Sequence, residues 1–146
     1  MRKIAITGLS GTIGTVFLRN YTSQDEIWDL YHSKPDRSLD RQIHLDLSTC
    51  TQIDSTLTQI NPDIIIHMAA ITHIDTCEND KKNGIQGRVW QINVHATDAI
   101  AQYCERTGTF LLFLSTECVF DGKTGRYTEH APTSPINWYG VTKEAA

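Results

Sequence analysis

The chain has 146 residues, which is the length of one domain with a single sizeable hydrophobic core. Hydrophobic residues make up 40% and charged residues 21%, a balance typical of globular proteins and too apolar for a disordered segment. The formal net charge is -4 without a basic block, so we expect no nucleic-acid partner. No apolar stretch approaches the roughly 20 residues that span a bilayer, so we expect no membrane partner either.

The cysteine and histidine spacings give no sign of a metal centre. The four cysteines form no CxxC pair, and the six histidines form neither an HxH nor an HExxH spacing. The first residues also lack the continuous apolar region of a signal peptide. We therefore expect a cytoplasmic protein with reduced thiols and no bound metal.

Short β-branched apolar runs alternate with longer amphipathic stretches along the chain. In chain order, the patterns predict strand Lys3–Thr7, helix Thr12–Tyr21, strand Glu26–His32, strand Gln42–Asp46, helix Thr51–Ile60, strand Asp63–Met68, loop Thr72–Gly87, helix Arg88–Arg106, strand Phe110–Ser115, loop Glu117–Pro135 and helix Pro135–Ala146. Continuous apolar strands joined by helices favour parallel pairing with helices on both faces. The sequence therefore predicts an α/β fold, a doubly wound parallel sheet of the Rossmann type, formed by one domain over residues 1–146.

Three glycines at a spacing of three, Gly8, Gly11 and Gly14, follow the first predicted strand and open the first predicted helix. Gly8 permits the tight turn out of the strand, Gly11 lets a pyrophosphate approach the backbone, and Gly14 lets the helix pack closely on the sheet. The N–H groups at the start of that helix then face the anion. Between a strand and a helix, the motif predicts a dinucleotide site, with a turn that binds no ligand as the alternative.

The residues after the second predicted strand bear on which dinucleotide is bound. The NAD fingerprint places an acid about 20 residues beyond the glycines, where it holds the ribose hydroxyls. Here the strand runs instead into Ser33 and Lys34, with Arg37 nearby. A hydroxyl and cations suit a 2′-phosphate, so NADP(H) is favoured over NAD(H). The alternative is that Lys34 and Arg37 are solvated surface charges.

The tips of the third and fourth predicted strands also face the expected site. Asp46 can accept a hydrogen bond from an adenine amino group or cap the following helix, and the sequence leaves both roles open. Ala69 and Ala70 are small enough to let the backbone approach a cofactor. Ordinary tight packing of a helix on the sheet is the alternative for these two alanines.

A candidate catalytic group combines the last predicted helix with the fifth strand. Tyr139 and Lys143 lie four residues apart and so share a helix face. A phenol titrates at about 10 when unperturbed, and we expect the nearby cation to lower the pKa of Tyr139. Ser115 and Thr116 lie at the C-terminal tip of the fifth predicted strand, where a hydroxyl can orient a reacting carbonyl. Alone, each feature suggests a surface pair or strand-end hydrogen bonding; with the glycine turn, they predict catalysis by Thr116, Tyr139 and Lys143.

Over almost its whole length, the chain resembles the cofactor domain of extended short-chain dehydrogenases/reductases. More closely, it resembles the dTDP-4-dehydrorhamnose reductase branch, which includes the methionine adenosyltransferase regulatory subunit. The residues that carry the resemblance are Gly8, Gly11, Gly14, Asp46-Leu47, Ala69-Ala70, Ile92-Asn93-Val94, Ser115-Thr116, Val119-Phe120-Asp121-Gly122, Tyr127-Thr128-Glu129, Pro132, Pro135 and Tyr139 to Lys143.

The resemblance implies reduction of the C4 ketone of a nucleotide-linked 4-keto-6-deoxysugar by NADPH or NADH. Tyr139 would donate the proton, with Thr116 and Lys143 completing the triad. The expected partner is thus a small-molecule sugar nucleotide; the oligomeric state is left open, with a homodimer as one option. The motifs and the resemblance together give the expected cofactor contacts Gly8, Ser10, Gly11, Thr12, Ile13, Gly14, Ser33, Lys34, Asp46, Leu47, Ala69, Ala70, Ile71, Tyr139 and Lys143.

Two features depart from the pattern of the branch. Glu117 and Cys118 replace its usual Asp-Tyr pair, which leaves the identity of the sugar open. The chain also ends three residues after Lys143, so we expect the substrate domain to be absent from it and the isolated chain to bind a dinucleotide better than a sugar nucleotide. The alternative functions are a non-catalytic, dinucleotide-binding regulatory module and a sugar-nucleotide epimerase or dehydratase.

Overall fold

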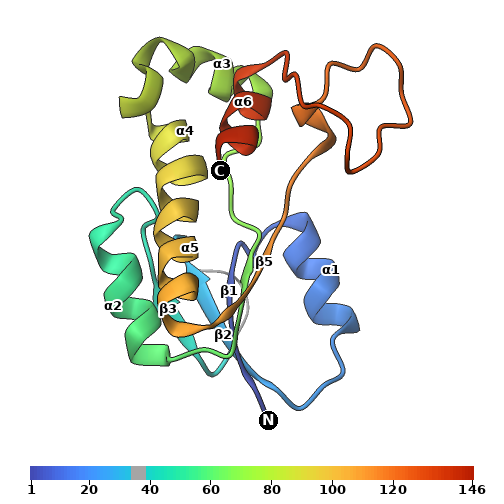
Figure 1. Cartoon of the computed structure of the whole chain (residues 1–146). Coiled ribbons are helices and arrows are strands. Elements are labelled where there is room, and N and C mark those ends of the chain that lie inside the picture. Colours follow the sequence, from blue (N-terminus) through green and yellow to red (C-terminus); the bar gives the residue numbers. More distant parts are fainter. Residues whose placement is uncertain (34–38) are drawn as a thin grey trace. The chain divides into compact units, whose positions relative to one another are not determined.

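The computed structural model describes residues 1–33 and 39–146, which form two compact units (Figure 1). We call Met1–Ala69 with Ala96–Leu114 the sheet unit, and Ala70–His95 with Ser115–Ala146 the helical unit. Lys34 and Arg37, on which the expected preference for NADP(H) depends, lie outside the described residues. In the described part of the chain, no helix has the length and apolar character needed to cross a membrane.

The sheet unit contains five parallel strands. They are β1 (Lys3–Thr7), β2 (Glu26–Tyr31), β3 (Gln42–His44), β4 (Ile64–His67) and β5 (Phe110–Phe113), in the order β3-β2-β1-β4-β5. Every strand expected from the apolar runs is present, and only the ends differ by one or two residues. The predicted parallel sheet is confirmed.

Helices cover both faces of this sheet, as Figure 1 shows. Helix α1 (Thr12–Asn20) packs Phe17 and Leu18 against the cluster that includes Ile4 and Ile66. Helices α2 (Thr51–Ile60) and α5 (Ala96–Thr107) contact one another on the opposite face, where the Tyr103 hydroxyl donates to the Leu57 carbonyl at 3.1 Å. The sheet unit is therefore doubly wound, as predicted.

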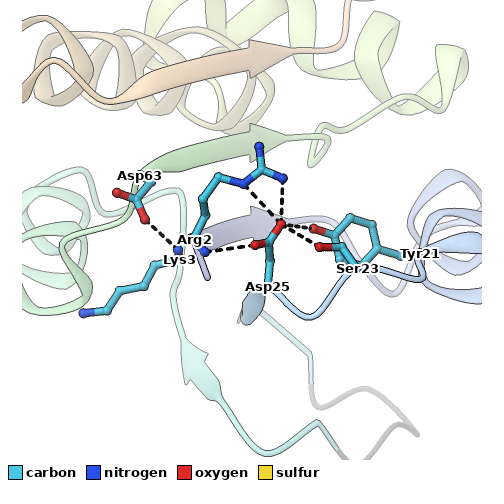
Figure 2. Close-up of polar contacts among 6 residues, drawn as sticks. All are labelled: Arg2, Lys3, Tyr21, Ser23, Asp25 and Asp63. Carbon is cyan, nitrogen blue, oxygen red and sulfur yellow. Dashed lines mark hydrogen bonds and ion pairs between the residues drawn. The ribbon is translucent and has the colours of Figure 1, made fainter.

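A polar cluster around Asp25 fixes the N-terminal end of the sheet (Figure 2). The Asp25 carboxylate accepts hydrogen bonds from the Arg2 backbone and guanidinium, from the Tyr21 hydroxyl at 2.7 Å and from the Ser23 hydroxyl at 3.0 Å. These donors, with Arg2 foremost, hold the pKa of Asp25 well below its usual range. Because Arg2 precedes β1 and Asp25 precedes β2, the cluster joins the starts of two neighbouring strands.

The helical unit is built mostly from short helical segments. They are α3 (Ile74–Asp80), the 3₁₀ segment η1 (Lys81–Gln86), α4 (Arg88–Trp90), the π-helical segment η2 (Gln91–His95), the 3₁₀ segment η3 (Glu117–Val119) and α6 (Trp138–Ala145). The helix predicted over Arg88–Arg106 thus consists of three consecutive segments, with a π-helical stretch that the apolar spacing did not indicate.

The prediction of a loop over Thr72–Gly87 is wrong, because most of this segment is helical. Polar side chains stabilise the ends of these short helices. His73 accepts a hydrogen bond from the Thr76 backbone at the start of α3, and Asp80 accepts from the Val89 backbone at 2.7 Å. The segment is too polar to show an apolar helical stripe, so its helices depend on these caps and not on periodicity.

Candidate functional site

In the glycine turn of the sheet unit, the backbone of Gly8 lies directly against that of Ala69, and the backbone of Gly14 lies against that of Leu9. Gly8 has a φ of +81°, and a Cβ there would lie 2.7 Å from the Ala69 nitrogen. A Cβ on Gly14 would lie 2.5 Å from the Leu9 Cα and 2.6 Å from the Gly8 carbonyl oxygen. Any side chain at Gly8 or Gly14 would therefore displace the main chain.

The start of α1 has the properties of an anion site. Helix α1 spans nine residues, has no acidic residue in its first turn and has no side-chain cap at Gly11. The first N–H groups of a helix lack intrahelical acceptors and attract negative charge. Ser10, Gly11, Thr12 and Ile13 are exposed. This turn fits the diphosphate of a dinucleotide, which needs backbone donors and no intervening side chain.

The other predicted cofactor residues of the sheet unit lie at strand ends. Ser33 is exposed after β2, Leu47 is buried, and Ala69 is half-buried after β4. One oxygen of Asp46 accepts from the Ser48 backbone at 2.9 Å and from its hydroxyl at 2.7 Å. The alternative that Asp46 caps α2 is wrong, because the residue preceding that helix is Cys50 and Asp46 stabilises a local turn instead.

Thr116, Tyr139 and Lys143 all lie in the helical unit, together with Ala70 and Ile71. Tyr139 and Lys143 are one turn apart on α6, which begins where the Asn137 side chain accepts from the Gly140 backbone at 2.7 Å. The Thr116 hydroxyl donates to the Glu117 carboxylate and accepts from the Cys118 backbone, both at 3.2 Å, and it lies close enough to the Tyr139 phenol to lower its pKa. Helix α6 lies so close to η3 that a Cβ on Gly140 would collide with the Cys118 carbonyl oxygen. The small residue thus allows Tyr139 to reach Thr116.

Burial dominates the protonation of Tyr139 and Lys143. It raises the pKa of Tyr139 in spite of the opposing influence of the nearby Thr116 hydroxyl, and it lowers the pKa of Lys143 to about 8. Our expectation that a neighbouring cation lowers the pKa of Tyr139 is therefore wrong for this structure. The Tyr139 phenol is therefore protonated at neutral pH. The Lys143 side chain is only 6% exposed, and its pKa lies within about one unit of neutral pH.

Asn93 links the backbone at Ile71 to α6, a role that the sequence did not reveal. Its side-chain oxygen accepts from the Ile71 nitrogen at 2.8 Å, and its amide donates to the Ile71 oxygen and to the Thr142 hydroxyl, both at 3.0 Å. Thr142 in turn donates to the Tyr139 carbonyl oxygen at 2.8 Å. Both Asn93 and Thr142 are buried, so these bonds are shielded from water. The motif Ile92-Asn93-Val94 contained the only sequence signal for this link.

The parallel, doubly wound sheet with a glycine turn at the start of α1 defines an α/β protein of the Rossmann type. The family model described as "RmlD substrate binding domain" matches residues 1–146. The chain therefore belongs to this family.

Relatives and solved structures share the similarity over nearly the whole chain. Methionine adenosyltransferase 2 subunit beta of Danio rerio is 28% identical over 142 residues, which cover 97% of this chain and 41% of that protein. A hypothetical dTDP-4-dehydrorhamnose reductase from Sulfolobus tokodaii superposes with a TM-score of 0.85 at 30% identity, covering 99% of this chain and 50% of the other. The Bacillus anthracis dTDP-4-dehydrorhamnose reductase in complex with NADP gives 0.82 at 27% identity, covering 99% and 47%. The chain thus spans half or less of the length of these proteins.

Proposed function

We propose that this chain binds a nicotinamide dinucleotide, NADPH in preference to NADH, and supplies the proton donor for reduction of a nucleotide-linked 4-keto-6-deoxysugar. The observation that carries the proposal is that Thr116, Tyr139 and Lys143 lie in one compact unit, with Thr116 close to the Tyr139 phenol and Lys143 one turn further along α6. Similarity to dTDP-4-dehydrorhamnose reductases, one of them in complex with NADP, supports the substrate class and the cofactor.

The glycine turn would hold the cofactor, which supplies the hydride when it is bound. Backbone N–H groups at the start of α1 would receive the diphosphate, and Ala69 would let the cofactor approach the main chain. Further contacts are assigned to Ser33, Lys34, Asp46, Leu47, Ala70 and Ile71 on the basis of the sequence motifs and of the family resemblance.

Tyr139 is suited to act as an acid. Because burial raises its pKa, the phenol keeps its proton at neutral pH and can donate it to an alkoxide oxygen. Lys143 would donate a hydrogen bond to a ribose hydroxyl of the bound cofactor. Thr116 would orient the ketone and share its developing negative charge.

Titration of the purified chain with NADPH and NADH, by fluorescence or calorimetry, tests the cofactor part of the proposal. We expect saturable binding with NADPH the tighter ligand, and Tyr139→Phe should bind NADPH within about twofold of the unchanged chain, since only one hydroxyl is lost. Gly11→Val should bind much more weakly because its side chain fills the approach to the turn. Equal, weak binding of both dinucleotides by the unchanged chain and by Gly11→Val would contradict the proposal.

A non-catalytic regulatory module is the second candidate, because the zebrafish relative is a subunit of methionine adenosyltransferase. Incubation with NADPH and a dTDP-linked 4-keto-6-deoxysugar separates the two functions. Consumption of NADPH that disappears in Tyr139→Phe supports the reductase. Saturable NADPH binding without turnover, in the unchanged chain and the variant alike, supports the regulatory module.

A further inference from the structure

His67 is a buried ionisable residue in the sheet unit to which the proposed chemistry assigns no role. It ends β4 with 1% of its surface exposed, and its ring stacks on Phe113 with the centroids 5.7 Å apart. Its Nδ1 lies 2.6 Å from the Thr7 hydroxyl oxygen, and its Nε2 lies 3.1 Å from the hydroxyl oxygen of Thr97 on α5. The imidazole therefore bridges the ends of two strands and a helix.

This bridge ends at the glycine turn. The Thr7 hydroxyl oxygen, which contacts His67, also accepts a hydrogen bond from the Ala69 nitrogen at 3.2 Å. Thr7 immediately precedes Gly8, and the Gly8 backbone lies directly against Ala69. Thr7 thus joins the first residue of the turn to the backbone segment beside it, and the imidazole holds the Thr7 side chain in the rotamer that makes this bond.

An imidazole suits this position for a geometric reason. In the tautomer with its proton on Nε2, the ring accepts from Thr7 at Nδ1 and donates to Thr97 at Nε2. Because the ring is rigid, it can accept from Thr7 and donate to Thr97 at the same time. The Thr7 side chain is thereby linked, through His67, to Thr97 on α5. An apolar residue of similar size would leave two buried hydroxyls with fewer partners.

We propose that His67 is a positioning residue of the dinucleotide site, which acts through Thr7 to hold the Gly8–Ala69 backbone in the arrangement that receives the diphosphate. This inference rests on the proposed function, because it assumes that the turn binds a dinucleotide. It assigns to His67 no contact with the ligand and no step in the reaction.

Two substitutions of His67 separate positioning from simple packing. In His67→Asn the side-chain amide occupies the place of Nδ1 and can keep the bond to Thr7, whereas in His67→Gln it reaches the place of Nε2 and keeps only the bond to Thr97. Both variants lose the stacked ring and should lose similar thermal stability. We expect His67→Gln to bind NADPH about tenfold more weakly than the unchanged chain, and His67→Asn within about threefold of it.

Tyr103→Phe provides the matched control. It removes a buried hydrogen bond of the same unit, between α5 and α2, without touching the turn. It should lower the melting temperature and leave the affinity for NADPH unchanged. If His67→Gln and His67→Asn lose affinity equally, or if neither loses affinity, His67 has only a packing role and the inference is overturned.

Hydrogen exchange of the ligand-free chain gives a second readout that needs no cofactor. Exchange of the Ala69 amide should accelerate in His67→Gln, which loses the bond that orients the Thr7 hydroxyl, and in Thr7→Val, which loses the hydroxyl itself. It should not accelerate in His67→Asn or Thr7→Ser, because both keep a hydroxyl at position 7 and a side chain at position 67 that orients it. Unchanged exchange in His67→Gln would overturn the inference. If the unchanged chain binds no NADPH, the proposed function fails instead, so the two failures are distinguishable.

Discussion

The candidate functional residues of the sheet unit and those of the helical unit differ in kind. In the sheet unit these residues contribute main-chain atoms, because Gly8 and Gly14 pack directly against backbone and leave no room for a side chain. In the helical unit they contribute side chains, and the helix that carries two of them is held by the buried amide of Asn93 and the buried hydroxyl of Thr142. We therefore expect added atoms at Gly8 or Gly14 to destabilise the sheet unit, and lost hydrogen bonds at Asn93 to destabilise the helical unit.

Substitution of Gly14 should give the largest effect. Gly14→Ala places a Cβ 2.5 Å from the Leu9 Cα, which is backbone and cannot rotate away, so we expect a loss of about 2–4 kcal/mol in the free energy of unfolding. Gly11→Ala is the matched control, because its Cβ comes no closer than 3.3 Å to any neighbour that it meets. Urea denaturation followed by circular dichroism measures both, and equal stability of the two variants would contradict the backbone contact.

Substitution of Asn93 tests the helical unit in the same way. Asn93→Leu keeps the number and branching of the side-chain heavy atoms but removes the partners of the Ile71 backbone and of Thr142, so we expect a loss of about 2–3 kcal/mol in the free energy of unfolding. Asn83→Ala, which removes an exposed amide bonded to Asp80 in the same unit, should change stability by less than about 0.5 kcal/mol. Equal denaturation midpoints for Asn93→Leu and Asn83→Ala would show that the Asn93 link is not needed.

The Asp25 cluster, at the N-terminal ends of β1 and β2, should make a pH-dependent contribution to the stability of the sheet unit. The pKa of Asp25 is lower in the folded chain than its ordinary value of 3.8, so the charged carboxylate stabilises the fold above that pH. This contribution disappears as the pH falls below 3.8 and the carboxylate is protonated in the folded chain too. Asp25→Asn should therefore melt at a lower temperature than the unchanged chain at pH 7, and the two melting curves should converge in acid. A constant difference from pH 7 to pH 2 would contradict this assignment.

The smallest expected effect concerns Lys143, whose burial in the charged form lowers the stability of the fold at neutral pH. Its pKa falls to about 8 in the folded chain from an ordinary 10.5, so the unfolded chain binds more protons between these values and stability rises with pH across that window. Lys143→Met has no group to titrate and should lack this rise. Denaturation midpoints of the two proteins at pH 7.5, 9 and 10.5 measure it, and parallel pH profiles would show that Lys143 is not titrating in a buried place.

The sequence was most informative where a single segment defines its own structure. Helix α2 spans the predicted residues Thr51–Ile60, and β1 spans the predicted Lys3–Thr7, because apolar periodicity and local turns suffice for both. The segment Thr72–Gly87 was misassigned because its helices depend on caps by His73 and Asp80. Polar side chains that cap short helices resemble the composition of a loop.

Within the candidate site, the sequence could identify the residue types but not their environment. The spacing of Tyr139 and Lys143 placed both on α6, yet it predicted a lowered phenol pKa, whereas burial raises it. Burial depends on which segments pack around α6, including η3 and the π-helical segment that contains Asn93. No local pattern reveals that set of neighbours.

By itself, the sequence determined the doubly wound parallel sheet, the glycine turn and the presence of a phenol and an amine one helical turn apart. These follow from local backbone preferences and from hydrophobic periods, which act over a few residues. Only the tertiary structure decided that His67 bridges Thr7 and Thr97 and that Asn93 bridges Ile71 and Thr142. Such bonds join residues more than 20 positions apart and form only when the buried surroundings exclude water as their competitor.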